Sequence, residues 1–250
     1  MKNEDSNNRL PAYSEFVYGH IYNDLDKSNA RDNDFSANLR TFFQYDKLIE
    51  SSLFPVKMNQ AVLQMGLVFG GQIDAVARCV GAYGQYDVLD INGLQVSRCQ
   101  EKYGNIYPAL KIFKQDASLI DIKEQYDTVI CFMLLQELPQ VTKAKVINKA
   151  LAAVKPGGSV VFVDWHRPSF WHPLRYLVRM YNRLKHPFVE KLWDREIETY
   201  ANNKTSFMWY KSTYFGGMFQ RVIATRKTSP LQEISEADSR PKSKAYLPDF

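Results

Sequence analysis

Short apolar runs and longer amphipathic runs alternate along the middle of the chain. Apolar segments that suit buried strands occupy 61–65, 86–91, 110–115, 127–133 and 159–165. The segments between them carry apolar residues at helical spacing, and glycine or proline closes several of them. Strands that are apolar on both faces and separated by helices are typical of a parallel sheet covered on both sides. We therefore predict an α/β domain with a Rossmann-like, mostly parallel sheet.

The pattern changes near the end of this domain. Residues 205–226 contain two alternating segments on either side of Gly216-Gly217. Two such segments around a glycine turn predict an antiparallel hairpin. Added to the five preceding strands, the hairpin would complete a seven-stranded sheet.

The predicted boundaries follow from where the apolar pattern begins and ends. We expect one domain over 11–226, with an N-terminal helical lid at 11–58 and a helical insertion at 166–204. The polar segments 1–10 and 227–250 have little to bury, so we expect them to be flexible. Aromatic residues of the lid segment could cover a substrate or pack on the sheet: Tyr13, Phe16, Tyr18 and Tyr22.

Composition excludes several classes of protein. Hydrophobic residues make up 45% of the chain, which suits a globular core, and the net charge of +5 is too mild to indicate nucleic-acid binding. The three cysteines lack the spacing of metal ligands, which favours a reducing compartment without structural zinc or disulfides. The first ten residues are polar, and no apolar run approaches the roughly 20 residues of a membrane span. We expect neither a signal peptide nor a transmembrane helix.

A glycine-containing turn follows the first predicted strand. Gly66 and Gly70 would let the backbone pass close to a ligand, although a tight turn alone explains them equally well. Asp90 and Asp116 end the second and third strands. Either one could simply cap a helix, but strand-end acids that meet at one crevice of a parallel sheet favour nucleotide binding.

This arrangement resembles the Rossmann-like methyltransferases that depend on S-adenosylmethionine (SAM). Their first motif is an acid, any residue and G-x-G-x-G, and Gln64 stands here in place of the acid. The segment 155–158, Lys-Pro-Gly-Gly, also matches the turn before their fifth strand. The cofactor-binding residues that the resemblance implies are Gln64, Met65, Gly66, Phe69, Gly70, Asp90, Ile91, Asp116, Ala117, Phe132 and Leu134.

A narrower resemblance is to the rhodoquinone biosynthesis methyltransferase-like proteins. The family tends to have histidine where this chain has Gln136, just before Glu137. That difference puts a catalytic or metal role of Gln136 in doubt. The segments that carry the likeness are 62–65 with 68–70, 134–139, 163–168, 171–175 and 215–222.

The narrower resemblance implies amino transfer. SAM would donate its α-amino nitrogen to the ring of ubiquinone and displace a methoxy group, with Mn²⁺ assisting. The uncharged amide of Gln64 would not raise the pKa of that amine, as a carboxylate would, so the reactive neutral form would be easier to reach. Two alternatives remain: a conventional SAM-dependent methyltransferase that acts on a quinone or lipophilic phenol, and a non-catalytic SAM-binding partner protein.

Candidate catalytic residues follow the fourth and fifth strands. Asp164 and His166 flank Trp165 and would point to the same side of the sheet, and Glu137 follows the neighbouring strand. A carboxylate and an imidazole suit a first-row metal, so Asp164 and His166 are candidate manganese ligands. His166 could instead be a general base, or the pair could form a hydrogen-bonded corner. His172 and His186 follow within the same insertion.

The insertion also contains a basic amphipathic segment. Apolar residues recur at helical spacing between Trp171 and Trp193, and Arg175, Arg179 and Arg183 form a stripe. Such a helix packs on the core of its own protein or lies at a membrane surface, and different faces can do both. The resemblance implies a ubiquinone substrate, and with it a peripheral location at the cytoplasmic face of a bacterial-type inner membrane. The sequence leaves the oligomeric state open.

Overall fold

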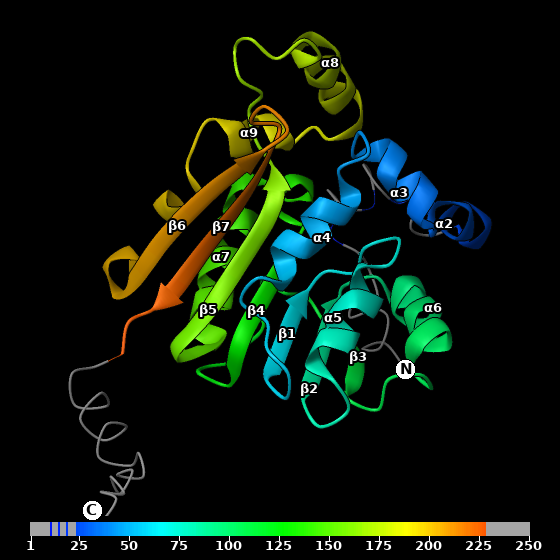
Figure 1. Cartoon of the computed structure of the whole chain (residues 1–250), viewed down its shortest axis with the longest axis vertical. Coiled ribbons are helices and arrows are strands. Elements are labelled where there is room, and N and C mark those ends of the chain that lie inside the picture. The colour runs from blue at the N-terminus through cyan, green and yellow to red at the C-terminus, as the bar shows by residue number, and fades with distance from the viewer. Residues whose placement is uncertain (1–10, 12–14, 16–18, 20–23, 229–250) are drawn as a thin grey trace, which may run out of the picture.

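A computed structural model describes Pro11, Glu15, Gly19 and residues 24–228 of the chain (Figure 1). The expectations for 1–10, for 229–250 and for the four aromatic residues of the lid segment lie outside the described residues.

The core of the fold is a seven-stranded sheet in the order β3-β2-β1-β4-β5-β7-β6. The pairs within β1 to β5 are parallel, and β7 runs antiparallel to both β5 and β6. This confirms the predicted mostly parallel sheet with a C-terminal antiparallel hairpin. The strands are β1 Ala61–Met65, β2 Gln85–Asp90, β3 Leu110–Lys114, β4 Tyr126–Phe132, β5 Val154–Trp165, β6 Phe207–Tyr214 and β7 Phe219–Arg226.

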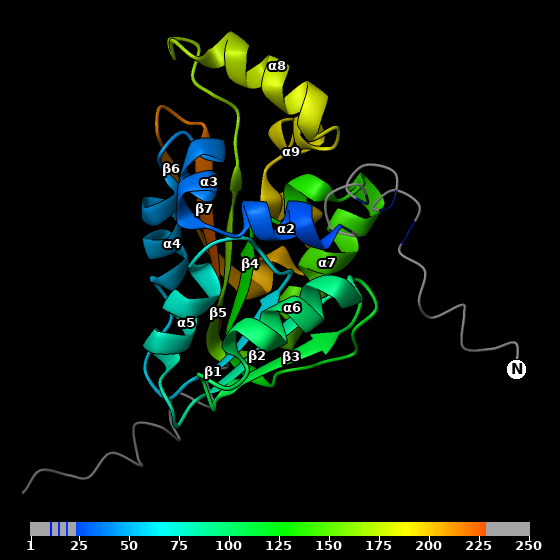
Figure 2. The same ribbon diagram turned by 90° about the vertical axis from the view of Figure 1, so that its right-hand side faces the viewer.

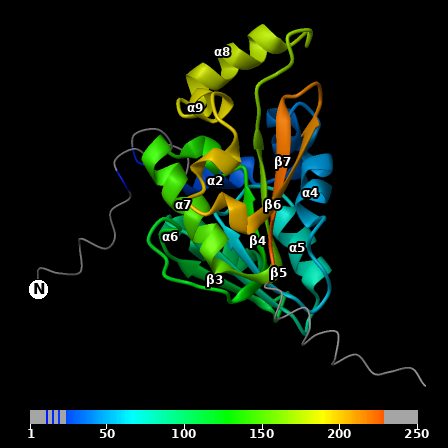
Figure 3. The ribbon, with the colours of Figure 1, turned by 90° about the vertical axis from the view of Figure 1, so that its left-hand side faces the viewer.

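Helices cover both faces of the sheet. In Figures 2 and 3, α4 and α5 lie on one face and α7 lies on the other. The helices are α2 Leu25–Arg31, α3 Asp34–Arg40, α4 Tyr45–Leu53, α5 Gln72–Val80, α6 Gly93–Tyr103, α7 Gln140–Ala153, α8 Arg175–Lys185 and α9 Val189–Trp193. Short 3-10 turns are η1 Leu135–Glu137, η2 Ile197–Tyr200 and η3 Lys204–Ser206.

Each central strand contributes side chains to two separate cores, because successive side chains of a strand point to opposite faces. Along β5, Val161, Val163 and Trp165 join the core beneath α4, α5 and α6. Val160 and Phe162, which alternate with them, join the core beneath α7. Trp165 and the residues on either side of it therefore face different layers of the protein.

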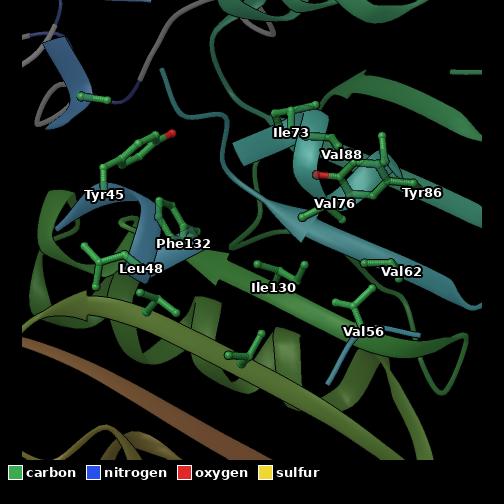
Figure 4. Packing of buried hydrophobic residues seen from close by; sticks show 14 of the residues in the cluster. Tyr45, Leu48, Val56, Val62, Ile73, Val76, Tyr86, Val88, Ile130 and Phe132 are labelled. Atoms are coloured by element: carbon green, nitrogen blue, oxygen red, sulfur yellow. The ribbon is translucent and has the colours of Figure 1, made fainter. Parts of the chain in front are cut away.

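Residues of α4 close the first core near the ends of the strands. Figure 4 shows Tyr45 and Leu48 of α4 beside Phe132 of β4. The rings of Tyr45 and Phe132 meet edge to face with their centroids 6.1 Å apart, and Leu48 is fully buried. This contact fixes the N-terminal segment over the carboxyl end of β4.

The segment 166–204 forms α8 and α9 beyond the carboxyl end of β5 (Figures 1 and 2) and η2, whose Tyr200 carbonyl accepts a hydrogen bond from Asn148 of α7. Val178 on α8 is buried, whereas most of that helix is exposed. No helix within the described residues is long and apolar enough to cross a bilayer.

We predict that Gly84→Ala destabilises the fold by about 1–3 kcal/mol, because the added methyl group overpacks the turn before β2. An ideal Cβ at Gly84 would lie 2.4 Å from Cγ1 of Val80 and 2.8 Å from the carbonyl oxygen of Gln60. Urea denaturation measures the change. Gly93→Ala is the matched control, since the three atoms nearest to its Cβ all belong to the flexible side chain of Lys114, the first at 3.3 Å. Equal midpoints for Gly84→Ala and the wild type would contradict the close packing of this turn.

Candidate functional site

A cavity of about 440 Å³ lies at the carboxyl ends of β1, β2 and β4. That volume is within the usual range for a small-molecule site. The loops that follow β1, β2, β3 and β4 supply one part of its wall. The rest comes from residues of α2, α3, α4, α6, α7 and α8 and from Trp165 at the end of β5.

The loop after β1 owes its shape to two glycines. Gly66 and Gly70 have φ angles of +89° and +95°, a region that favours glycine. A Cβ at Gly70 would also lie 2.8 Å from the hydroxyl oxygen of Tyr45. Gly66 lines the cavity, whereas Gly70 shapes the turn and does not line it. Gly66 therefore lies where a bound ligand could contact it, whereas Gly70 acts on the shape of the loop.

Hydrogen bonds from several elements hold this loop in place. The backbone N–H of Leu67 donates to Oδ2 of Asp90 at 2.8 Å, and the Tyr45 hydroxyl donates to the Phe69 carbonyl at 2.7 Å. The N–H groups of Gly70 and Gly71 donate, each at 2.8 Å, to carboxylates on either side of the start of α3. These carboxylates, Asp32 and Asp34, occupy the end of α5 that otherwise attracts an anion.

Asp32 is held in its ionised form. Burial alone would raise the pKa of its carboxyl, but the hydrogen bonds from Lys102 and from the Gly70 N–H, with the charges of Lys102 and Arg98, bring that pKa below its usual value. Arg98 Nη1 lies 2.7 Å and Lys102 Nζ 2.8 Å from Oδ2 of Asp32. This charge cluster ties α6 and the segment before α3 to the loop.

The two predicted strand-end acids line the same cavity. Asp90 accepts hydrogen bonds from the N–H groups of Leu67 and Asn92, and burial raises its pKa to about 6. Asp116 accepts one from the Ser118 N–H at 2.7 Å. The predicted cofactor-binding residues that line the cavity are Gly66, Phe69, Asp90, Ile91, Asp116, Ala117, Phe132 and Leu134. Met65 does not, since it is fully buried in the core beneath α7.

The structure corrects the role expected for Gln64. Its side chain is fully buried and is not part of the cavity wall. Its Nε2 donates to the Gly66 carbonyl at 3.1 Å and to Oε1 of Gln72 at 2.8 Å, and its Oε1 accepts from the Tyr86 hydroxyl at 2.6 Å. Because both ends of the amide are bonded within the protein, Gln64 supports the loop from beneath and does not face a ligand.

Asp164 is also a supporting residue. It is fully buried, and its Oδ2 accepts from the N–H groups of Leu135 and Gln136 at 2.7 and 3.3 Å, while its Oδ1 accepts from the Trp165 N–H at 2.8 Å. Burial raises its pKa to about 7, although these N–H groups and the charge of Lys143 oppose the shift. Asp164 therefore fixes the loop after β4, and its side chain does not reach the cavity where the predicted catalytic role would need it.

His166 faces away from the cavity as well. Its Nδ1 lies 2.8 Å from the Gly217 carbonyl and its Nε2 lies 3.0 Å from Nζ of Lys211, on the hairpin side of the sheet. Burial lowers the pKa of the imidazole. The pleat explains this placement, because Asp164 and His166 share one face of β5 and Trp165, on the other face, lines the cavity.

The residues present do not fit the expected manganese ion. Within the described residues, no group of three or more His, Cys, Asp or Glu side chains could hold a metal. Asp164 is fully buried and does not line the cavity, and the ring nitrogens of His166 lie against the Gly217 carbonyl and Nζ of Lys211. Neither residue can serve as the predicted ligand in this arrangement.

The loop after β4 brings two polar side chains to the cavity. Glu137 lines it, as predicted from its position after the strand. Gln136 also lines it and is only 5% exposed. Its Nε2 donates to the Met133 carbonyl at 3.1 Å, but its Oε1 has no hydrogen-bond partner within the described part of the chain. A buried acceptor without a partner is costly, so a ligand that donates a hydrogen bond here would be favoured.

An aromatic wall, which was not predicted from the sequence, forms another part of the cavity. Trp165, Tyr181 and His186 line it, with the Trp165 and His186 rings 6.4 Å apart and the Tyr181 and His186 rings 6.0 Å apart. Burial, with the charges of Arg40 and Arg31, lowers the pKa of His186 to about 4. The imidazole is therefore neutral near pH 7. Strand alternation could have shown that Trp165 faces the cavity; no local signal marks Tyr181 or His186.

Two arginine side chains line a further part of the cavity. Arg31 and Arg40 line the cavity beside the loop after β1, and Arg40 lies over the Phe69 ring at 5.7 Å. Its Nη1 also donates to Oγ of Ser36 at 2.8 Å. These arginines end α2 and α3. The sequence of these helices does not predict that they pack over the ends of the strands.

Comparison with known proteins agrees with this fold. Residues 62–158 match the family described as a methyltransferase domain. No curated protein sequence matches the chain. The fold is the Rossmann-like fold of class I SAM-dependent methyltransferases.

Solved structures of this fold resemble the chain at low sequence identity. The N-methyltransferase NodS of Bradyrhizobium japonicum WM9, in complex with S-adenosyl-L-homocysteine, is 13% identical with a TM-score of 0.59, over 87% of this chain and all of that one. An O-methyltransferase family protein of Burkholderia thailandensis is 14% identical with a TM-score of 0.64, over 86% of this chain and 64% of that one. A SAM-dependent methyltransferase of Aquifex aeolicus is 16% identical with a TM-score of 0.53, over 81% of this chain and 98% of that one.

We predict that Tyr86→Phe lowers the free energy of unfolding by about 1–3 kcal/mol, because it leaves Oε1 of Gln64 buried without a donor. The affinity for SAM should change by less than about threefold, or roughly 0.6 kcal/mol. Urea denaturation and calorimetric titration measure the two quantities. Tyr83→Phe is the control, since Tyr83 is 91% exposed. A large loss of SAM affinity at unchanged stability would instead show that the amide of Gln64 serves the ligand.

Proposed function

We propose that the protein binds SAM in this cavity and transfers its α-amino nitrogen to the ring of ubiquinone. The observation that supports this best is the composition of the cavity. Carboxylates at the ends of β2 and β3 suit a nucleoside, and an aromatic wall on the other side suits a planar ring.

The strand-end acids give the nucleoside its orientation. Asp90, with one carboxylate oxygen on the Leu67 N–H and the other on the Asn92 N–H, faces the cavity where a ribose would lie. A carboxylate has acceptor capacity beyond those two bonds, so it can also bind the ribose hydroxyls. Asp116 and Ala117 would lie beside the adenine. The methionine portion would then extend over the loop after β1 toward Arg31 and Arg40.

Cations beside the methionine portion favour the chemistry of amino transfer. Arg40 or Arg31 can pair with the SAM carboxylate. Their positive charge also disfavours the ammonium form of the α-amine and lowers its pKa. Among the described residues of the cavity wall, the carboxylates belong to the ends of β2, β3 and β4 and not to this loop. The positive charges of the two arginines thus favour the neutral, nucleophilic form of the amine, a role that the sequence had assigned to Gln64.

The remaining groups of the cavity suit the acceptor ring. Trp165 and Tyr181 would stack on it, and the neutral imidazole of His186 can accept the proton that the attacking amine loses. In that step a carbon–nitrogen bond forms at a ring carbon, and the methoxy group of that carbon leaves with a proton as methanol. The bond between this nitrogen and the α-carbon of SAM must break next: the adduct isomerises as the quinone is reduced to the quinol and the N–Cα bond is oxidised to an imine, and water hydrolyses the imine to the aminoquinol and the 2-oxo acid of SAM. Oε1 of Gln136 can accept a hydrogen bond from the same amine. The choice of ubiquinone rests on the narrower sequence resemblance.

Methyl transfer to a quinone or a lipophilic phenol is the second candidate. It is favoured by the solved structures of the same fold, which include an N-methyltransferase and an O-methyltransferase family protein. The same cavity would place the SAM methyl group, and not its amine, against the acceptor.

Isotope-labelled SAM separates these functions. Purified protein is incubated with a short-chain ubiquinone and SAM that carries ¹⁵N in its amino group and deuterium in its methyl group. Amino transfer predicts a quinone product that contains ¹⁵N and no deuterium. Deuterium in the product, with S-adenosylhomocysteine as co-product, would establish methyl transfer. SAM binding without any product would support a non-catalytic partner protein.

The raised pKa of Asp90 predicts a pH-dependent affinity for SAM. The carboxylate is the form that accepts the ribose hydroxyls, so binding should be strong above about pH 6 and weaken as the pH falls through that value. Asp90→Asn should weaken binding by about 10–100-fold at pH 7.5, since hydrogen bonds to charged groups contribute about 1.5–3 kcal/mol.

Calorimetric titration between pH 5 and 8 measures this dependence. Asp121→Asn is the matched control, because Asp121 is exposed and lies outside the cavity wall. Binding that Asp90→Asn leaves unchanged at every pH would contradict the placement of the ribose.

A further inference from the structure

A cluster of large apolar side chains is exposed at one end of the molecule. Figures 1 and 3 show α8 at this end, beyond the carboxyl end of β5. Trp171, just before the helix, is 87% exposed, and Leu184, near its end, is 75% exposed. The exposed apolar residues of this surface, which we call the α8 surface, are Phe170, Trp171, Tyr176, Leu177, Met180 and Leu184.

The helix presents these residues on a single face. Tyr176, Leu177, Met180 and Leu184 follow one another at the spacing of one helical stripe. Val178 and Asn182 are fully buried and mark the face that packs on the protein. The apolar stripe therefore points outward, where the described part of the chain does not cover it.

Positive charge accompanies this stripe. α8 has the sequence RYLVRMYNRLK, with three arginines, one lysine and no acidic residue. Arg179 and Arg183 lie 3.5 and 3.6 Å from a single carboxylate oxygen of Glu190 and remain 55% and 69% exposed. Since one carboxylate serves two guanidinium groups, the α8 surface keeps an excess of positive charge.

We propose that the α8 surface docks on a bilayer that contains anionic lipids. Aromatic and aliphatic side chains beside arginine and lysine are the combination that lies in the interface of such a bilayer. Tryptophan and tyrosine are favoured at the level of the headgroups, and the cations are attracted by the negative surface. The excess charge on the helix distinguishes this partner from a neutral apolar surface.

The α8 surface is continuous with the rim of the cavity. Leu184 and Lys185 line the cavity, and so does Leu39 of α3, which is 58% exposed. A bilayer against α8 would therefore lie beside the cavity. A lipophilic substrate could then enter the cavity without crossing water. This consequence rests on the proposed function, whereas the docking of the α8 surface does not rest on it.

Flotation of the full chain with lipid vesicles tests the docking without any turnover or SAM. The vesicles contain phosphatidylcholine alone or with about 30 mol% phosphatidylglycerol, in about 0.1 M salt. The disrupting variant combines Trp171→Ser, Tyr176→Ser and Met180→Ser. The matched control combines Met58→Ser, Tyr83→Ser and Ile106→Ser, which are exposed residues that precede β1, β2 and β3 at the opposite edge of the sheet.

Docking predicts that the wild type and the control float with the anionic vesicles and that the disrupting variant binds at least about tenfold more weakly. The tryptophan emission of the wild type should shift to the blue on binding, and Trp171→Phe should remove most of this shift while the protein still binds. Arg175→Gln with Lys185→Gln should reduce the preference for anionic vesicles.

Three outcomes would overturn the proposal. The first is a wild type that does not float with anionic vesicles, and the second is a disrupting variant that floats as well as the wild type. The third is a wild-type dimer in sedimentation velocity that the disrupting variant converts to monomer, since a second copy of the chain would then cover the α8 surface.

Discussion

The arrangement of the cavity depends on the hydrogen bonds that hold the loop after β1. The Gln64 amide bonds the Gly66 carbonyl from beneath, and Asp90 accepts the Leu67 N–H from the neighbouring strand. Carboxylates beside α3 and the hydroxyl of Tyr45 bind the far side of the same loop. Residues of β1, β2, α4 and the start of α3 therefore meet at this loop, and its backbone is preorganised before a ligand arrives.

Much of the fold and of the nucleotide side of the site follows from local sequence. Apolar runs of strand length, separated by amphipathic runs, predict a parallel sheet because only a sheet covered on both faces buries them. The carboxyl ends of such strands meet at one edge, so the positions of Gly66, Asp90 and Asp116 in the sequence are enough to place them together. These predictions depend on periodicity and topology, which a single sequence contains.

The remaining features depend on contacts between distant segments. Gln64 lies at a position where a ligand contact was expected, but partners on α5 and β2 take up its whole amide. Asp164 and His166 do share a face, yet their side chains bond to backbone and hairpin groups there and do not line the cavity, and only the orientation of β5 decides this. The arginines of α2 and α3 and the imidazole of His186 reach the cavity through the packing of separate helices. No pattern along the chain specifies such packing.

The central claim is that SAM binds across the ends of β1, β2 and β3 with its methionine portion directed toward Arg31 and Arg40. A crystal structure of the complex with S-adenosylhomocysteine tests it most directly. We expect the ribose hydroxyls on Asp90, the adenine beside Asp116 and Ala117, and the amino acid portion beside the two arginines. A nucleoside bound elsewhere, or an amino group in contact with a carboxylate of the protein, would contradict it.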